Sequence, residues 1–242
     1  MPNRKVYKTP PALRTALEAR LLDLAKLTGT DIQRLRRRVG FDRFLARLFA
    51  QARDQYPWFL KGGYAMEIRM HVARTTKDID LSIASQSPIG ADVLHRMIDE
   101  AASFELPDGF TFQVGESILD LDAAPQGGCR FPVQATMAGR PFVGFQVDIA
   151  VGDELIEPTD QVEGEGWFDF AGLPRPTFRM ISCEQQFAEK IHAYTLQKRD
   201  RDIHALKIWW ISCSWCRPKC NLSACARTST KRLLAAARIL SQ

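Results

Sequence analysis

The 242-residue sequence contains no long apolar run free of charges, and its N-terminus lacks the apolar core of a secretory signal. Crossing a bilayer takes about 18 or more mostly apolar residues, and a signal peptide requires an apolar stretch after its basic start. These absences argue against a membrane-spanning or exported protein, and we expect a cytoplasmic chain with no membrane partner. The sequence also has no internal repeat and no low-complexity tract.

Histidine is rare, and the four histidines do not stand at metal-ligand spacing from a second histidine or a cysteine. We therefore expect ordinary surface or packing roles for them. Cysteine is unevenly distributed, because Cys129 and Cys183 are isolated, whereas four others crowd the end of the sequence, at Cys213, Cys216, Cys220 and Cys225.

In a reducing compartment, crowded cysteines favour a metal site over disulfides. Zinc sites more often use two separated pairs of ligands. A divergent tail, or a tail produced by a reading-frame change in the gene, are the other interpretations of this segment.

Hydrophobic residues make up 45% of the chain, which is enough for a sizeable core. Lysine and arginine number 33 against 28 aspartates and glutamates, giving a net charge of +5 and a pI near 9.0. This mild excess suits a polyanion such as RNA or a nucleotide.

Apolar spacing predicts two helices at the N-terminus, over residues 11–28 and from about residue 30 to residue 55. The second helix would turn Arg34, Arg37, Arg38 and Arg47 outward, as a solvated face or a contact for nucleic acid. Further helices are predicted over residues 64–71, 91–103, 183–198 and 201–212. The Ser182 and Gln185 spacing is that of a capping box.

Alternating apolar residues predict strands over residues 58–61, 78–83, 109–114, 129–137 and 141–153. The Gly- and Pro-rich residues 163–178 are predicted to form a loop. Strands and helices in this order predict an α+β (mixed α/β) fold, in which helices flank a small mixed sheet.

The most informative stretch is FLKGGYAMEIRMHVARTTKDIDLSI, residues 59–83, where a glycine pair precedes two alternating aspartates. Successive side chains of a strand face opposite ways, so Asp78 and Asp80 share one face while Ile79 and Leu81 enter the core. Two anions that close repel each other unless a cation lies between them, and Mg²⁺ prefers such oxygen ligands.

A third acid is positioned in the same way, because Asp148 alternates with apolar residues of the strand predicted over residues 141–153. If the two strands are neighbours, all three carboxylates meet at one magnesium site, with Mn²⁺ as the substitute. A metal-bound carboxylate cluster favours phosphate chemistry.

The segment at residues 59–83, preceded by RFLARLFAQ and followed downstream by EQQFAEKIHAYT, resembles the AbiEii-type nucleotidyltransferases. These are the toxin halves of abortive-infection toxin–antitoxin pairs and belong to the DNA polymerase beta-like superfamily. The resemblance covers roughly residues 10–206. It implies a nucleotidyltransferase-type fold and Mg²⁺-dependent transfer of a nucleotide from an NTP, with release of pyrophosphate.

The resemblance also implies roles for individual residues. Gly62 and Gly63 would open a helix whose amides receive nucleotide phosphates, with Lys61 and Lys77 nearby as further NTP contacts. The acids Asp78, Asp80 and Asp148 match the metal-binding set, and Asp148 can accept the proton of the attacking hydroxyl.

Two downstream residues complete the implied catalytic set. Lys190 matches a lysine that grips the triphosphate. Asp202 matches the first aspartate of an Arg-Asp-x-x-Asp-Leu segment, although Ala205 stands where the second would be. That departure keeps open a degenerate relative that binds nucleotide or RNA without catalysis.

The implied acceptor is the 3′ end of tRNA, and the implied partner is a cognate antitoxin that acts as a transcriptional regulator. A protein-nucleotidylating enzyme and a sugar-nucleotide glycosyltransferase are the alternatives, although the glycine pair and Lys190 argue against the latter. We divide the chain into N-terminal helices (residues 1–56), the nucleotidyltransferase core (57–165), a helical part completing the active site (166–212) and a divergent cysteine-rich tail (213–242).

Overall fold

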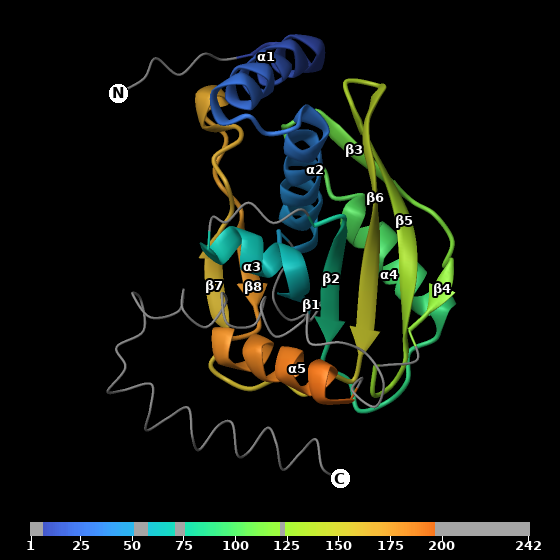
Figure 1. Ribbon diagram of the computed structural model, residues 1–242. Helices are drawn as coiled ribbons and strands as arrows, with labels where there is room; N and C mark the ends of the chain where they lie inside the picture. Colours follow the sequence, from blue (N-terminus) through green and yellow to red (C-terminus); the bar gives the residue numbers. More distant parts are fainter. Residues whose placement is uncertain (1–6, 51–57, 71–75, 122–123, 197–242) are drawn as a thin grey trace. The chain divides into compact units, whose positions relative to one another are not determined.

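The computed structural model describes residues 7–50, 58–70, 76–121 and 124–196, drawn in colour in Figure 1. The chain separates into two compact units, residues 1–181 and residues 182–242. The first unit has the predicted mixed α/β fold. Over the described ranges, no helix combines the length and the apolar character that a membrane span requires. The division into four parts stays a prediction.

The first unit is built on an eight-stranded mixed sheet with the order β3-β5-β6-β2-β1-β8-β7, and β4 pairs with β5. The pairs β2–β6 and β1–β8 are parallel, and the remaining pairs are antiparallel. The strands are β1 (Trp58–Lys61), β2 (Asp78–Ile83), β3 (Phe110–Val114), β4 (Leu119–Asp120), β5 (Gly128–Met137), β6 (Arg140–Val151), β7 (Asp160–Glu163) and β8 (Thr177–Met180).

Four α-helices and a short 3₁₀ helix accompany the sheet (Figure 1). They are α1 (Pro10–Thr28), α2 (Ile32–Leu48), α3 (Gly62–Met70), α4 (Ala91–Ala102) and η1 (Asp169–Ala171). Local sequence fixes their ends: the Asp31 side chain accepts the Arg34 amide 3.0 Å away at the start of α2, and Gly29 ends α1 in the left-handed region, with φ of +66°.

The two faces of the sheet differ in polarity. Phe145 of β6 packs against Phe41 and Phe44 of α2, with ring centroids 5.0 and 5.6 Å apart. Helix α4 contacts β3 and β5 from the same side, since His95 lies 5.8 Å from Phe131, the register partner of Val147. The opposite face carries the polar side chains of β2, β6 and β5, and the candidate site lies there.

Helix α2 departs from the predicted pattern. It ends at Leu48, whereas the prediction ran to residue 55, and residues 51–57 lie outside the described part. The prediction that Arg47 faces outward was wrong: its side chain is 1% exposed and forms hydrogen bonds of 2.8 and 3.0 Å with Asp108. Because other elements surround the second half of α2, no face of it is left for solvent, and a buried acid neutralises Arg47.

Sequence patterns missed three short strands and η1. Both β7 and β8 flank the predicted loop over residues 163–178, and β4 holds two residues. In the second unit, α5 (Cys183–Leu196) begins as predicted, because the Ser182 hydroxyl accepts the Gln185 amide at 3.2 Å. The helix predicted over residues 201–212 and the cysteine-rich tail lie outside the described residues.

Candidate active site

The acid pair stands on β2 as the alternation predicts. Ile79, Leu81 and Ile83 are at most 2% exposed and enter the core, whereas Asp78 and Asp80 are partly exposed on the opposite face. The strand spans the residues that the sequence pattern indicated. The pair therefore projects from a strand that its apolar residues anchor.

The third acid, Asp148, lies beside the pair. Strands β2 and β6 run parallel in a register that sets Asp80 opposite Asp148 and Asp78 opposite Gln146. Register partners in a sheet share a face. The structure thus brings the three predicted carboxylates together on the polar face, from two neighbouring strands.

The glycine pair makes room for the acids. Gly62 has a φ of +70°, and a Cβ built there would lie 1.8 Å from Asp80 Oδ2. A Cβ on Gly63 would lie 2.5 Å from Thr76 Oγ1. The Gly63 amide donates a hydrogen bond of 3.3 Å to Asp80 Oδ2. Only glycine allows the start of α3 to approach Asp80 this closely.

Burial and like charge perturb Asp80. Burial is the largest effect and raises the pKa of its carboxyl from 3.8 to about 6; the charges of Asp78 and Asp148 raise it further, while the Gly63 hydrogen bond and Lys61 lower it. A carboxyl with such a pKa sits in an environment that disfavours its own negative charge. The cluster would gain stability from a bound cation.

The two predicted lysine contacts have different surroundings. Lys61 is the register partner of Asp80, and its ammonium forms an ion pair with Asp153. The same Asp153 oxygen accepts the Ser82 hydroxyl at 2.7 Å. Lys77 precedes Asp78 and lines a neighbouring pocket. Sequence reasoning missed Asp153, which follows β6 in a turn and carries no periodic signal.

A second missed residue, Arg130 of β5, binds the third acid. Its Nε and Nη2 atoms each lie 2.6 Å from one oxygen of Asp148. The two residues are register partners in the antiparallel pair β5–β6. This bidentate contact uses both Asp148 oxygens as acceptors.

The donor chemistry of the acids fits a divalent cation, because Mg²⁺ is held by one or two carboxylates together with substrate phosphates. Asp78 and Asp80 supply such a pair. Within the part of the chain that the structure describes, no group of three or more His, Cys, Asp and Glu side chains is arranged as a metal site. Asp148 would join the pair only after Arg130 releases it.

Two predicted residues fall beyond this description. Lys190 belongs to α5, but its side chain lies outside the described residues, as does Asp202. The four tail cysteines lie outside them as well. Their assigned roles stay predictions.

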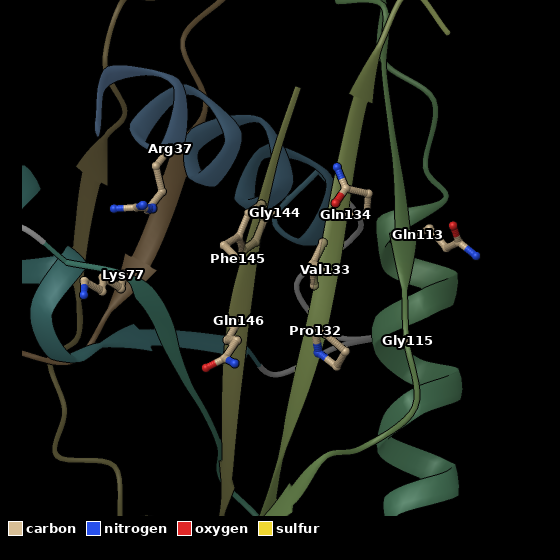
Figure 2. A pocket seen from close by; sticks show the side chains of 10 residues that line it. All are labelled: Arg37, Lys77, Gln113, Gly115, Pro132, Val133, Gln134, Gly144, Phe145 and Gln146. Atoms are coloured by element: carbon tan, nitrogen blue, oxygen red, sulfur yellow. The ribbon is translucent and has the colours of Figure 1, made fainter. Parts of the chain in front are cut away.

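A pocket of about 620 Å³ adjoins the acids on the polar face of the sheet. Figure 2 shows its lining residues, which come from β6, β5, β3, α2 and the residue preceding β2. Gln146 is both a lining residue and the register partner of Asp78. The pocket therefore begins directly beside the acid pair.

Known proteins share this arrangement. Two 2″-aminoglycoside nucleotidyltransferases, from Klebsiella pneumoniae and Escherichia coli, are each 29% identical over 162 residues, which cover 60% of this chain and 86% of the relative. The fold resembles that of MenT4, a nucleotidyltransferase toxin from Mycobacterium tuberculosis H37Rv, with a TM-score of 0.53 and 20% identity. That match covers 73% of this chain and spans 58% of the MenT4 chain.

A family model settles the relationship suggested by the glycine pair and the acids. The model described as "Nucleotidyl transferase AbiEii toxin, Type IV TA system" matches residues 43–205, which include β1, α3, β2 and β6. The chain belongs to the AbiEii nucleotidyl transferase toxin family.

Proposed function

We propose that this protein transfers a nucleotide from an NTP to an acceptor hydroxyl, with release of pyrophosphate, and that it is the toxin of a toxin–antitoxin pair. The observation that carries the proposal is the meeting of Asp78, Asp80 and Asp148 on one sheet face, next to the glycine-led start of α3. Carboxylates beside a phosphate-binding helix end are the parts that phosphoryl transfer needs.

The residues of the chain divide the work. Backbone amides at the start of α3 would hold the triphosphate, because Gly62 and Gly63 leave the helix end uncovered. Asp78 and Asp80 would hold a divalent cation, Mg²⁺ or Mn²⁺, which neutralises phosphate charge when bound. Asp148, once free of Arg130, would complete this set or accept the proton of the attacking hydroxyl. Lys61 stabilises the ionised form of Asp80 from the next strand.

Lys190 and Asp202 complete the proposal from their place in the sequence alone. A lysine ammonium beside the triphosphate would offset the charge that develops as pyrophosphate leaves. Membership in a toxin family also supports a cognate antitoxin, proposed here as a transcriptional regulator. Coexpression supports that partner if one neighbouring gene product restores the growth of cells producing this chain.

The proposed acceptor is the 3′ end of tRNA. Two unrelated acceptor chemistries compete, since the curated relatives are named for aminoglycosides, which are polycations, whereas tRNA is a polyanion. The pocket beside the acids is lined by Arg37 and Lys77 and by no acidic residue. A cationic pocket repels a polycation and attracts a polyanion, which favours the nucleic acid.

The function is tested with each radiolabelled NTP in turn, Mg²⁺ and total tRNA. Asp80→Asn should abolish the transfer of label, because the substitution removes one anionic ligand. Asp99→Asn, at an exposed acid of α4, is the matched control and should retain activity. Equal transfer by the Asp80→Asn variant and the wild type would rule out the mechanism.

Separate reactions with a protein acceptor and with an aminoglycoside identify the acceptor class. Label on protein alone would replace tRNA in the proposal while leaving the nucleotidyl transfer intact. Nucleotide binding in calorimetry without pyrophosphate release, whatever the acceptor, would favour a relative that binds without catalysis.

A further inference from the structure

The pocket beside the acids has a polar floor. Gln146 of β6, Gln134 of β5 and Gln113 of β3 line it together with Pro132. Gln134 is the register partner of Gln113, and Pro132 that of Gln146, so these four residues lie side by side on the polar face. Figure 2 shows them across three neighbouring strands. Such a floor offers amide donors and acceptors beside a flat apolar ring.

Two cations bound the pocket at its end nearest β2. Figure 2 shows Arg37 reaching from α2 on the same side as Lys77. Among the described residues, neither side chain forms an ion pair or a hydrogen bond with the protein. The neighbouring arginines are different, because carboxylates pair with each of Arg34, Arg36 and Arg38.

Unpaired cations indicate an anionic ligand. A buried or half-buried charge is normally balanced within the protein, and α2 balances the arginines on either side of Arg37. Leaving Arg37 and Lys77 unbalanced at one pocket makes a local positive potential. Phosphate groups are the chemistry that such a pair of cations recognises.

The position of the pocket separates it from the proposed triphosphate site. The sheet order places β2 and β6, which carry the acids, between β1 on one side and β5 and β3 on the other. Helix α3 follows β1 directly, whereas the pocket floor lies on β6, β5 and β3. In phosphoryl transfer the attacking and leaving oxygens lie in line on opposite sides of the phosphorus. The pocket thus lies on the side from which an acceptor would attack.

We propose that this pocket binds the terminal nucleotides of a single-stranded nucleic acid acceptor. Arg37 and Lys77 contact its phosphates, and Gln146, Gln134 and Gln113 hydrogen-bond its base edges. Its volume of about 620 Å³ falls in the range of roughly 300–1,000 Å³ for small-ligand sites, so it fits a chain end and not a duplex. Unstacked RNA ends are recognised in this way, through base edges and phosphates. This inference rests on the proposed nucleotidyl transfer.

The inference assigns Lys77 to the acceptor, whereas the sequence resemblance made it an NTP contact. In the reaction, the acceptor 3′ oxygen forms a bond with the α-phosphorus, the bond from that phosphorus to the pyrophosphate oxygen breaks, and the hydroxyl proton passes to a carboxylate such as Asp148. Neither pocket cation takes part in these bond changes. Their substitution should therefore change the binding of the acceptor.

The experiment compares Arg37→Gln/Lys77→Gln with the charge-matched control Lys26→Gln/Arg96→Gln, whose side chains are exposed on α1 and α4. Fluorescence anisotropy measures the affinity of the metal-free and NTP-free protein for a labelled single-stranded RNA copying a tRNA 3′ end. The pocket variant should bind at least about tenfold more weakly than the control. Its log–log salt slope should be smaller by about 1.4, since each lost phosphate contact on a single strand removes about 0.7.

Two further readouts separate the pocket from the triphosphate site. The NTP affinity, measured by calorimetry, should match that of the control, and single Arg37→Gln and Lys77→Gln variants should show which cation contributes more. In the transfer reaction, the KM for RNA should rise and kcat should stay close to the control value. A loss of NTP affinity confined to Lys77→Gln would return Lys77 to the triphosphate and overturn that half of the assignment.

The failures are distinguishable. If the wild type labels RNA and the pocket variant binds and labels it as the control does, the pocket inference fails and the nucleotidyl transfer stands. If the wild type labels no RNA but the pocket cations still govern RNA binding, the proposed function fails and the pocket inference stands. An aminoglycoside that accepts label, with a KM that falls when the two cations are removed, overturns the pocket inference.

Discussion

Arg130 holds both oxygens of Asp148, with its Nε and Nη2 atoms each 2.6 Å from one of them. Asp148 is also the register partner of Asp80. The contact therefore ties the third acid of the site to β5, while the other two acids remain on β2. A cation that recruits all three carboxylates must compete with the Arg130 guanidinium.

This competition makes Arg130→Gln a test of the acid cluster. The substitution frees the Asp148 oxygens and removes a positive charge beside the site, so Mn²⁺ should bind about fivefold to tenfold more tightly, equivalent to roughly 1 kcal/mol. Calorimetry on the NTP-free protein measures the affinity. Arg140→Gln, at the exposed start of β6, removes one charge away from the acids and should leave the affinity unchanged. Unchanged or weaker Mn²⁺ binding by Arg130→Gln would mean that Arg130 supports the site instead.

Asp80 predicts a trade of stability for function. Its pKa is raised from 3.8 to about 6, chiefly by burial. Between these pH values the unfolded chain has released this proton while the folded protein keeps it. The free energy of unfolding of the metal-free protein should therefore fall as pH rises from about 4 to about 6, by up to about 3 kcal/mol for a shift of about two units.

Asp80→Asn should remove this loss. Metal-free Asp80→Asn should be about 1–3 kcal/mol more stable than the wild type at pH 7.5 and no more stable at pH 4, since only the ionised carboxylate is destabilising. Urea unfolding at both pH values measures the difference, with Asp99→Asn as the control. A variant less stable than the wild type at pH 7.5 would show that the ionised Asp80 is stabilised by its neighbours and not repelled.

The sequence predicts the acid site better than its surroundings because period-two alternation is a local signal. Ile79 and Leu81 must face the core, and that requirement alone assigns Asp78 and Asp80 to the other face. Arg130 escaped prediction because its role depends on the register between β5 and β6, which nothing local to its own strand specifies. Arg37 escaped for a similar reason, since only the ion pairs of its neighbours distinguish it within a run of arginines.

The errors in the fold have the same origin. Helical periodicity predicted one solvated face for α2, but the surrounding elements bury its second half, including Asp42 and Arg43 at 0% and 4% exposure. Strands β7 and β8 hold four residues each, too few for a clear alternating pattern. They are held by pairing with each other and, through Met180, with Leu60 of β1.

Gly62→Ala should separate the two demands that the structure makes of this glycine. Its positive φ costs an alanine about 1 kcal/mol, and a Cβ placed 1.8 Å from Asp80 Oδ2 adds a clash. Gly139 has nearly the same φ, +71°, but open space around it. Gly139→Ala should therefore show the backbone cost alone. Urea unfolding should find Gly62→Ala the less stable of the two by a further 1 kcal/mol or more, since the start of α3 must shift.

Nucleotide binding provides the second measurement on the same pair of variants. Gly62→Ala should also weaken NTP binding, whereas Gly139→Ala should not. Equal stability of the two variants would mean that α3 moves away from Asp80 without cost, and the close approach would then have no structural role.

Arg47→Met tests whether the buried charge network is held together by pairing. Arg47 donates to both Asp108 oxygens and to the Phe110 carbonyl, and its side chain and that of Asp108 are 1% and 0% exposed. Removing one partner of a buried pair leaves the other charge without compensation, which costs about 3–5 kcal/mol. Arg36→Gln, which breaks the partly exposed pair with Glu18, should cost less than about 1 kcal/mol.

A double variant distinguishes lost pairing from lost packing. Asp108→Asn removes the negative charge while keeping an oxygen for the Phe110 amide, which donates to Asp108 at 3.0 Å. If the uncompensated charge dominates, Arg47→Met/Asp108→Asn should unfold at a higher urea concentration than Arg47→Met alone. If packing of the arginine stem dominates, the second substitution should restore nothing. Recovery would also explain why α2 can bury charged residues: each cation there has an acid within reach, so the helix loses its solvated face without leaving an unpaired charge in the core.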